Sequence, residues 1–176
     1  MGRKKYFAAL AAAGMIGAMA LGSAFNSYAA DGWTKSNDHW TYIYQGKTYT
    51  GWLETSDGKY YMDLSDGHMT TGFKQIDGKW YFFRPNGVMA QNRWANPEYG
   101  KWYYFLDDGT MVTGWLKIGN DYYFMRGDGS MGTGWRQMEG SWYYFQSNGK
   151  AYKAPESGKV QLKTINGKKY AFDQDG

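Results

Sequence analysis

The stretch GDGSMG, residues 127–132, matches the pattern Gly-x-Gly-x-x-Gly of a dinucleotide-binding loop. Such a loop needs a helix directly after it, because the helix N-terminus receives the pyrophosphate. Residues 133–137 show neither an N-cap nor a helical apolar period. Asp-Gly and Asn-Gly pairs also recur along the whole chain, and such pairs favour tight turns. We therefore expect turns at these glycines and no nucleotide site.

The titratable side chains form no pattern typical of catalysis or metal binding. The two histidines, His39 and His68, fall at variable places in surroundings that otherwise repeat. Asp107-Asp108 and the pair Asp63 and Asp66 could suggest a calcium loop, but turn formation is the simpler explanation of both. A glycosidase needs two carboxylates fixed across a cleft, whereas the acids here follow the turns. Because the chain has no cysteine, disulfides and thiolate metal sites are excluded. The sequence predicts no enzyme, no cofactor and no metal centre.

An internal repeat organises most of the chain. Each repeat begins with Gly-Trp or a variant of it, continues to an aromatic run such as residues 102–105, and then reaches an Asp-Gly or Asn-Gly turn. A methionine often stands two places after that turn. The repeat-opening aromatics follow at spacings of 21, 21, 21 and 20 residues: Trp52, Phe73, Trp94, Trp115 and Trp135.

Each repeat is predicted to form a β-hairpin. In one of them the strand 114–118 returns as strand 121–124 after a turn at Gly119-Asn120, which pairs Trp115 with Phe124. Because side chains alternate along a strand, Trp115, Tyr122 and Phe124 share one face, while Tyr123 lies on the other. A single hairpin is marginal in water, so successive hairpins must stack. The predicted fold is an all-β solenoid of stacked β-hairpins. The tyrosines on the second face are predicted to be core: Tyr61, Tyr81, Tyr103, Tyr123 and Tyr143.

Residues 1–29 resemble a secretory signal, since Arg3, Lys4 and Lys5 precede an uncharged run that ends in Ser27-Tyr28-Ala29. We expect residues 30–152 to hold the hairpin repeats and residues 153–176 to form a degenerate or truncated terminal repeat. Three of the 20 Lys and Arg residues lie in the signal, which leaves 17 against 16 Asp and Glu. This balance favours no nucleic-acid partner, and no membrane partner once the signal is removed.

From Trp33 to Tyr152 the repeat closely resembles the choline-binding, or cell-wall-binding, repeats of Gram-positive surface proteins. The closing segment TINGKKYAFDQDG, residues 164–176, is similar to the glucan-binding repeats of secreted glucosyltransferases and clostridial toxins. The resemblance implies a secreted, non-catalytic module that attaches non-covalently to the cell wall. Its partner would be the choline-bearing teichoic acid of that wall.

In that family the ligand lies between consecutive hairpins. A trimethylammonium group has no N–H to donate, so ring faces hold it through cation–π attraction. The resemblance implies four cages: Trp94, Trp102 and Phe124 with Met111; Trp115, Tyr122 and Tyr144 with Met131; Phe73, Trp80 and Tyr104 with Met89; and Trp52, Tyr60 and Phe82 with Met69. Trp135 and Trp142 are also candidate ligand residues, but Ala171 stands where we expect their third ring, so their site is expected to be open or absent.

Two other functions remain open at this stage. The same aromatic faces could stack on the sugar rings of an α-glucan or another polysaccharide, as the closing segment suggests. The repeats could also form a structural spacer that needs no ligand.

Overall fold

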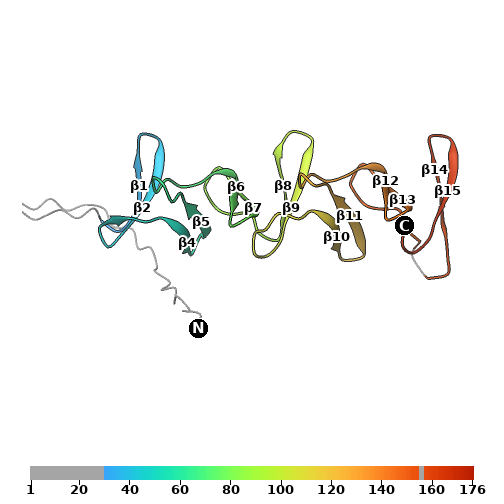
Figure 1. The fold of residues 1–176 in the computed structure, drawn as a ribbon, viewed down its shortest axis with the longest axis horizontal. Helices are drawn as coiled ribbons and strands as arrows, with labels where there is room; N and C mark the ends of the chain where they lie inside the picture. Colours follow the sequence, from blue (N-terminus) through green and yellow to red (C-terminus); the bar gives the residue numbers. More distant parts are fainter. Residues whose placement is uncertain (1–29, 155–156) are drawn as a thin grey trace, which may run out of the picture. The chain divides into compact units, whose positions relative to one another are not determined.

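The computed structural model describes residues 30–154 and 157–176. These residues form antiparallel β-strands and turns without any helix, so the predicted all-β class is confirmed (Figure 1). The predicted signal, residues 1–29, lies outside the described residues. In the described part of the chain, no helix is long and apolar enough to span a bilayer.

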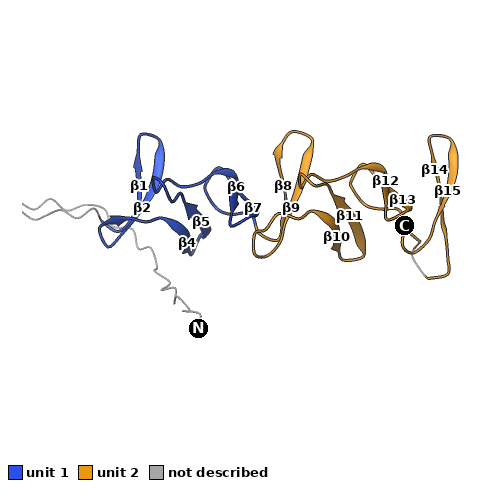
Figure 2. Cartoon of the chain, viewed as in Figure 1, with its two compact units in different colours: residues 1–90 blue, residues 91–176 orange. Residues whose placement is uncertain are grey.

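The chain divides into two compact units, with the boundary between Ala90 and Gln91 (Figure 2). The first unit holds a three-stranded sheet and two hairpins: β1 (Gly32–Ser36), β2 (His39–Tyr44) and β3 (Lys47–Thr48), then β4 (Gly51–Thr55) with β5 (Gly58–Met62), and β6 (Gly72–Ile76) with β7 (Lys79–Phe83). The second unit holds four hairpins: β8 (Arg93–Glu98) with β9 (Lys101–Phe105), β10 (Gly114–Ile118) with β11 (Asp121–Met125), β12 (Gly134–Met138) with β13 (Ser141–Phe145), and β14 (Gln161–Ile165) with β15 (Lys168–Phe172).

The strand register follows the prediction in the hairpin that was analysed in detail. Trp115 pairs with Phe124 and Lys117 with Tyr122, and the two-residue turn falls at Gly119-Asn120. The β6–β7 turn shows why such tips are tight, because Asp77 and Gly78 both have positive φ, at 50° and 77°. Two successive residues in this region produce the turn that matches the twist of antiparallel strands.

The recurring Asp-Gly and Asn-Gly pairs form a second tight turn behind each returning strand. At Asp128-Gly129 the carboxylate of Asp128 accepts hydrogen bonds from the backbone N–H and the hydroxyl of Ser130, at 2.9 and 2.6 Å. These bonds lower the pKa of Asp128. Gly129 has a φ of +80°, and a Cβ there would collide with the side chain of Met111. The turn therefore requires glycine on two grounds, backbone conformation and space.

Backbone hydrogen bonds that reach back along the chain stack the hairpins within each unit. The residue just after each second turn donates its N–H to a carbonyl oxygen in the returning strand of the preceding hairpin. The donor–acceptor pairs are Met69 to Trp40, Met89 to Lys59 and Met131 to Trp102, each at 2.7 Å, and Ala151 to Tyr122 at 2.8 Å.

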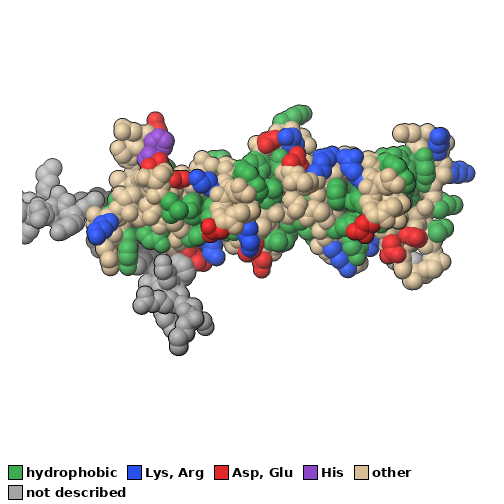
Figure 3. Space-filling model, in the orientation of Figure 1, with side chains coloured by type: hydrophobic (Ala, Val, Ile, Leu, Met, Phe, Trp, Pro, Cys, Tyr) green, Lys and Arg blue, Asp and Glu red, His purple; other side chains and the backbone are tan. Residues whose placement is uncertain are grey.

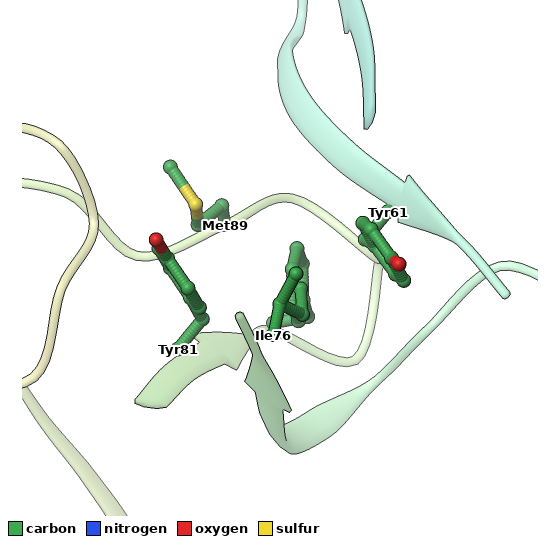
Figure 4. Close-up of a cluster of buried hydrophobic side chains, with 5 residues drawn as sticks. Tyr61, Ile76, Tyr81 and Met89 are labelled. Carbon is green, nitrogen blue, oxygen red and sulfur yellow. The ribbon is translucent and has the colours of Figure 1, made fainter. Parts of the chain in front are cut away.

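The core lies where hairpins meet. The last residue of each returning strand in the repeats is completely buried: Met62, Phe83, Phe105, Met125 and Phe145. Figure 4 shows one such cluster, with Tyr61, Ile76, Tyr81 and Met89 labelled, and Phe83 belongs to the same cluster. Of the predicted core tyrosines, Tyr61, Tyr81, Tyr103 and Tyr123 are buried and Tyr143 is half-buried.

Candidate ligand-binding junctions

The tryptophan-bearing face of one hairpin packs against the tyrosine-bearing face of the next. Trp94 of β8 contacts the buried cluster formed by Leu116, Tyr123 and Met125 in the following hairpin. The rings of Trp94 and Tyr123 have centroids 5.1 Å apart. We call each such place a junction and name it after its first-strand tryptophan.

This packing changes the third ring of the cages expected from the sequence. Tyr123, rather than Phe124, reaches Trp94, because unlike faces of successive hairpins meet. Phe124 packs against Trp115 across its own hairpin, at 6.2 Å. Similarly, Tyr143 rather than Tyr144 reaches Trp115, at 5.0 Å. The other three expected third rings also face the opening aromatic of their own hairpin: Tyr144 faces Trp135 at 5.1 Å, Phe82 faces Phe73 at 5.2 Å, and Tyr104 faces Trp94 at 5.2 Å.

The Trp135 junction has a third ring, which corrects the expectation that it would be open or absent. Tyr170, one residue before Ala171, lies 4.7 Å from Trp135 with an interplanar angle of 60°. Trp142 lies 6.3 Å from Trp135 at 81°. Trp142 is also the most exposed of the tryptophans, at 57%. Three rings from two successive hairpins therefore meet at a place open to solvent.

The Trp33 junction was not predicted as a cage, and it has the same geometry. Trp40 lies 6.4 Å from Trp33 at 87°, and Tyr60 of the next hairpin lies 4.8 Å from Trp33 at 61°. A sequence signal was present, because Trp40 follows Trp33 by seven residues, as Trp142 follows Trp135. The looser sequence around Trp33 hid this correspondence.

The Trp52 junction differs from the predicted cage in two rings. Tyr60 pairs with Leu53 and belongs to the Trp33 junction. Lys59 therefore occupies the position in β5 that Trp102 occupies in β9. The ring that reaches Trp52 from the next hairpin is Tyr81, at 5.1 Å. This junction therefore has two rings and a lysine. The sequence-based assignment was one residue out of register. Tyr60 is the first aromatic residue of its run, but the strand position equivalent to Trp102 is held by Lys59, one residue earlier.

The Trp115 junction has three rings and two additional cations. Tyr122 lies 6.4 Å from Trp115 at 86°, an arrangement close to that of the Trp33 and Trp135 junctions. However, the ammonium groups of Lys153 and Lys117 lie 4.3 and 5.3 Å from the centroid of the Tyr122 ring.

The remaining predicted cage draws on both units. Phe73 lies on β6 and Trp80 on β7 of the first unit, and Trp80 is 43% exposed. Tyr104 lies on β9 of the second unit, where its ring packs against Trp94 at 5.2 Å and its hydroxyl donates to Asn92 at 2.8 Å.

The methionine at a junction comes from the segment that follows the tyrosine-bearing hairpin. Met131, which the sequence analysis assigned to Trp115, donates its N–H to Trp102 and packs in the cluster that Trp94 contacts. Met69 is related in the same way to Trp40, and Met89 to Lys59. Met111, assigned to the Trp94 cage, packs its side chain against the Gly129 turn.

Two of the junction tyrosines, Tyr60 and Tyr123, are neutral. Burial raises the pKa of Tyr60 and of Tyr123, so both phenols stay protonated at physiological pH. The attraction that these rings offer to a cation therefore comes from their π faces, since no phenolate is present.

The histidines of the first unit lie together, although the sequence places them apart. His39 and His68 stack with centroids 4.3 Å apart and an interplanar angle of 7°, and His68 Nδ1 lies 2.9 Å from Asp66 (purple in Figure 3). Within the described residues, no group of three or more His, Asp and Glu side chains could hold a metal ion.

Two family models match the chain. The choline-binding repeat matches residues 70–106 and 99–133, and the putative cell wall binding repeat matches residues 50–69 and 133–151. Together these matches run without a gap from residue 50 to residue 151. A comparison with curated protein sequences gave no match.

Solved structures of related proteins share the fold. CbpJ from Streptococcus pneumoniae is 32% identical with a TM-score of 0.74, over 84% of this chain and 51% of CbpJ. Choline binding protein F from the same species is 36% identical with a TM-score of 0.70, over 84% of this chain and 47% of that protein. This chain thus spans about half the length of both proteins.

A third match is the pneumococcal cell wall endolysin from phage Cp-1, in a complex with choline. It is 28% identical with a TM-score of 0.51, over 74% of this chain and 37% of the endolysin. The unbroken repeat matches and the shared stack of β-hairpins lead to one conclusion: the chain belongs to the choline-binding, or cell-wall-binding, repeat family.

Proposed function

We propose that this chain is a secreted, non-catalytic module that holds itself to the cell wall by binding the choline residues of teichoic acid. The proposed sites are the junctions at which two aromatic residues of one hairpin meet a tyrosine of the next. The proposal covers the Trp33, Trp94 and Trp135 junctions. It also keeps Phe73 and Trp80 as candidate ligand residues in the first unit.

One observation carries this proposal. The Trp33 and Trp135 junctions lie in different units and share almost no residue identity outside their rings, yet their ring distances agree within about 0.1 Å (6.4 and 4.8 Å against 6.3 and 4.7 Å). A core requires only apolar contact, which leucine and valine also supply. The same arrangement of three rings therefore occurs at two partly exposed junctions of this chain. Such a repeated arrangement fits recognition of a cation by ring faces.

The expected affinity follows from the size of the attraction. A cation–π contact contributes roughly 0.5–2 kcal/mol, so one junction would bind free choline with a dissociation constant on the order of millimolar. Several junctions acting on one choline-decorated polymer would raise the avidity by about 10²–10⁴. Hydrophobic side chains (green in Figure 3) reach the surface in both units, as repeated contact with a polymer requires.

The test is a calorimetric titration of the protein with choline and, as a matched ligand, ethanolamine. Ethanolamine carries a primary ammonium that prefers water to ring faces, so choline should bind and ethanolamine should not. The Trp102→Leu variant should lose the site at the Trp94 junction and so bind one choline fewer, whereas Tyr99→Leu should keep every site, because Tyr99 is a fully exposed aromatic outside every junction. Equal heats for both ligands would refute the proposal, and so would binding to dextran that survives excess choline.

A further inference from the structure

A polar pocket of about 510 Å³ lies beside the Trp115 junction in the second unit. Its wall is built from the turn that begins β11, from the segment 151–154 after the Asn148-Gly149 turn, and from β14. Gln146, Gln161, Lys153 and Lys163 are among the residues that line it. The pocket falls within the size range of pockets that bind small organic ligands.

The charges that line this pocket are positive on balance. Its single carboxylate, Asp121, is already bound to Lys150 at 2.7 Å, and that bond raises the pKa of Lys150. In the part of the chain that the structure describes, neither Lys153 nor Lys163 takes part in an ion pair. Among the described residues, the two lysines that line the pocket therefore have no acidic partner.

Both lysines are held over aromatic rings rather than extended into solvent. The ammonium of Lys153 lies 4.3 Å from the centroid of Tyr122, and that of Lys163 lies 5.1 Å from the centroid of Tyr152. Each contact favours one position of a flexible side chain at the edge of the pocket. The two cations are thus placed before any ligand arrives.

The same arrangement works against a quaternary ammonium at the Trp115 junction. Tyr122 has Lys153 and Lys117 over its ring, so an incoming cation would meet two like charges at short range. No other described junction ring has a lysine or arginine in this position. The residue that reaches back to this junction is Ala151, whereas Met131 fills the corresponding place beside Trp102. Ala151 lines the pocket and leaves room there.

We propose that this pocket binds a phosphate group, held by the ammonium groups of Lys153 and Lys163 and by the side-chain amides of Gln146 and Gln161. A lysine ammonium is a compact charge that suits a phosphate oxygen. The volume leaves space for the sugar or polyol to which the phosphate is esterified. The inference rests on the proposed function only in taking a phosphate-linked wall polymer as the source.

The experiment follows the side-chain amide signals of Gln146 and Gln161 by NMR while the full chain is titrated with glycerol 3-phosphate. The signals should shift in the wild-type protein. In a Lys153→Met, Lys163→Met double variant the affinity should fall about tenfold or more, since two charge-assisted contacts are lost. The control is Lys168→Met, which removes an exposed charge from β15 in the same hairpin as Lys163 and should change nothing.

Two further titrations separate the outcomes. Phosphocholine that binds no better than glycerol 3-phosphate assigns the site to a backbone phosphate, and tighter binding assigns it to the phosphate esterified to choline. Amide signals that stay unmoved by glycerol 3-phosphate and by phosphocholine would overturn the inference, as would an unchanged affinity in the double variant. Choline binding at the other junctions, measured calorimetrically in the same samples, reports separately on the proposed function.

Discussion

The backbone N–H of Met131 donates a 2.7 Å hydrogen bond to the carbonyl oxygen of Trp102 in the preceding hairpin. Met131 follows β11, the strand that carries Tyr123. The segment from β11 to Met131 therefore carries Tyr123, the third ring of the Trp94 junction. The same segment is hydrogen-bonded to β9, the strand that carries the second ring, Trp102. A ligand at this junction would contact both hairpins, so its binding and their stacking are coupled.

Choline should consequently raise the unfolding temperature. A ligand that binds only the folded state at a hundred times its dissociation constant stabilises that state by about 2.7 kcal/mol per site. Differential scanning calorimetry in choline, compared with equal concentrations of ethanolamine, measures this effect. An identical transition in both solutions would show that no junction binds the quaternary amine.

Lys59→Trp should create one additional choline site. Lys59 occupies the place in its hairpin that Trp102 occupies in its own, and Trp52 and Tyr81 already supply the other two rings. Calorimetric stoichiometry should rise by one relative to the wild-type chain. Lys47→Trp, on the exposed strand β3, is the matched control and should leave the stoichiometry unchanged.

Tyr170→Leu should weaken the Trp135 junction. Its ring lies 4.7 Å from Trp135, and losing one cation–π contact of roughly 0.5–2 kcal/mol lowers the affinity of that site about 2- to 30-fold. Calorimetry on the variant measures the change. Lys169→Leu alters the neighbouring exposed position and should have no effect, and a loss as large in this control would show that Tyr170 acts only through hairpin stability.

Gly129→Ala should destabilise the second unit by about 1–3 kcal/mol, because an L-residue is strained at a φ of +80° and its Cβ collides with Met111. Gly127→Ala provides the control in the same turn, since a Cβ there meets nothing within 4 Å. Urea denaturation of both variants measures the difference. Equal stabilities would contradict the requirement for glycine at this turn.

Asp63→Asn should cost stability in a pH-dependent way. The Asp63 carboxylate accepts hydrogen bonds from Lys74 at 2.6 Å and from the hydroxyl and backbone N–H of Ser65, and these bonds hold its pKa well below the usual range. A lowered pKa in the folded state stabilises the protein above the unfolded pKa, near 4, and this stabilisation is lost as the pH falls through the folded value.

The wild-type protein should therefore exceed the Asp63→Asn variant by about 1–2 kcal/mol at pH 7, and the gap should narrow below about pH 4. Denaturant titrations at pH 7, 5, 4 and 3 follow this gap. Asp38→Asn, which breaks an exposed pair with Lys35 at 3.2 Å, should show no such dependence. A gap that stays constant down to pH 3 would rule out the linkage.

The sequence sufficed for the hairpins because local signals determine them. Turn residues, the two-residue tip at Gly119-Asn120 and alternation along the strands all act within one repeat. The buried tyrosines of the second face followed from the same alternation.

The junctions required information that one repeat does not contain. Which ring meets Trp94 depends on which face the next hairpin presents, and alternation within a hairpin does not determine that. Tyr123 was correctly placed on the face opposite to its own Trp115, and it is this opposite face that meets Trp94. In β5 the first aromatic residue, Tyr60, comes one position later than in β7, β9, β11 and β13. The sequence therefore did not reveal that Lys59 holds the equivalent strand position.

The hairpins β10–β11 and β12–β13 each have two roles, since the aromatic pair of each serves the junction after it and a tyrosine of each serves the junction before it. Gaining or losing one whole repeat would therefore change the number of junctions by one and leave the remainder intact. A break inside a hairpin would instead damage two junctions at once. Duplication of the underlying coding segment in units of one repeat would thus add junctions one at a time.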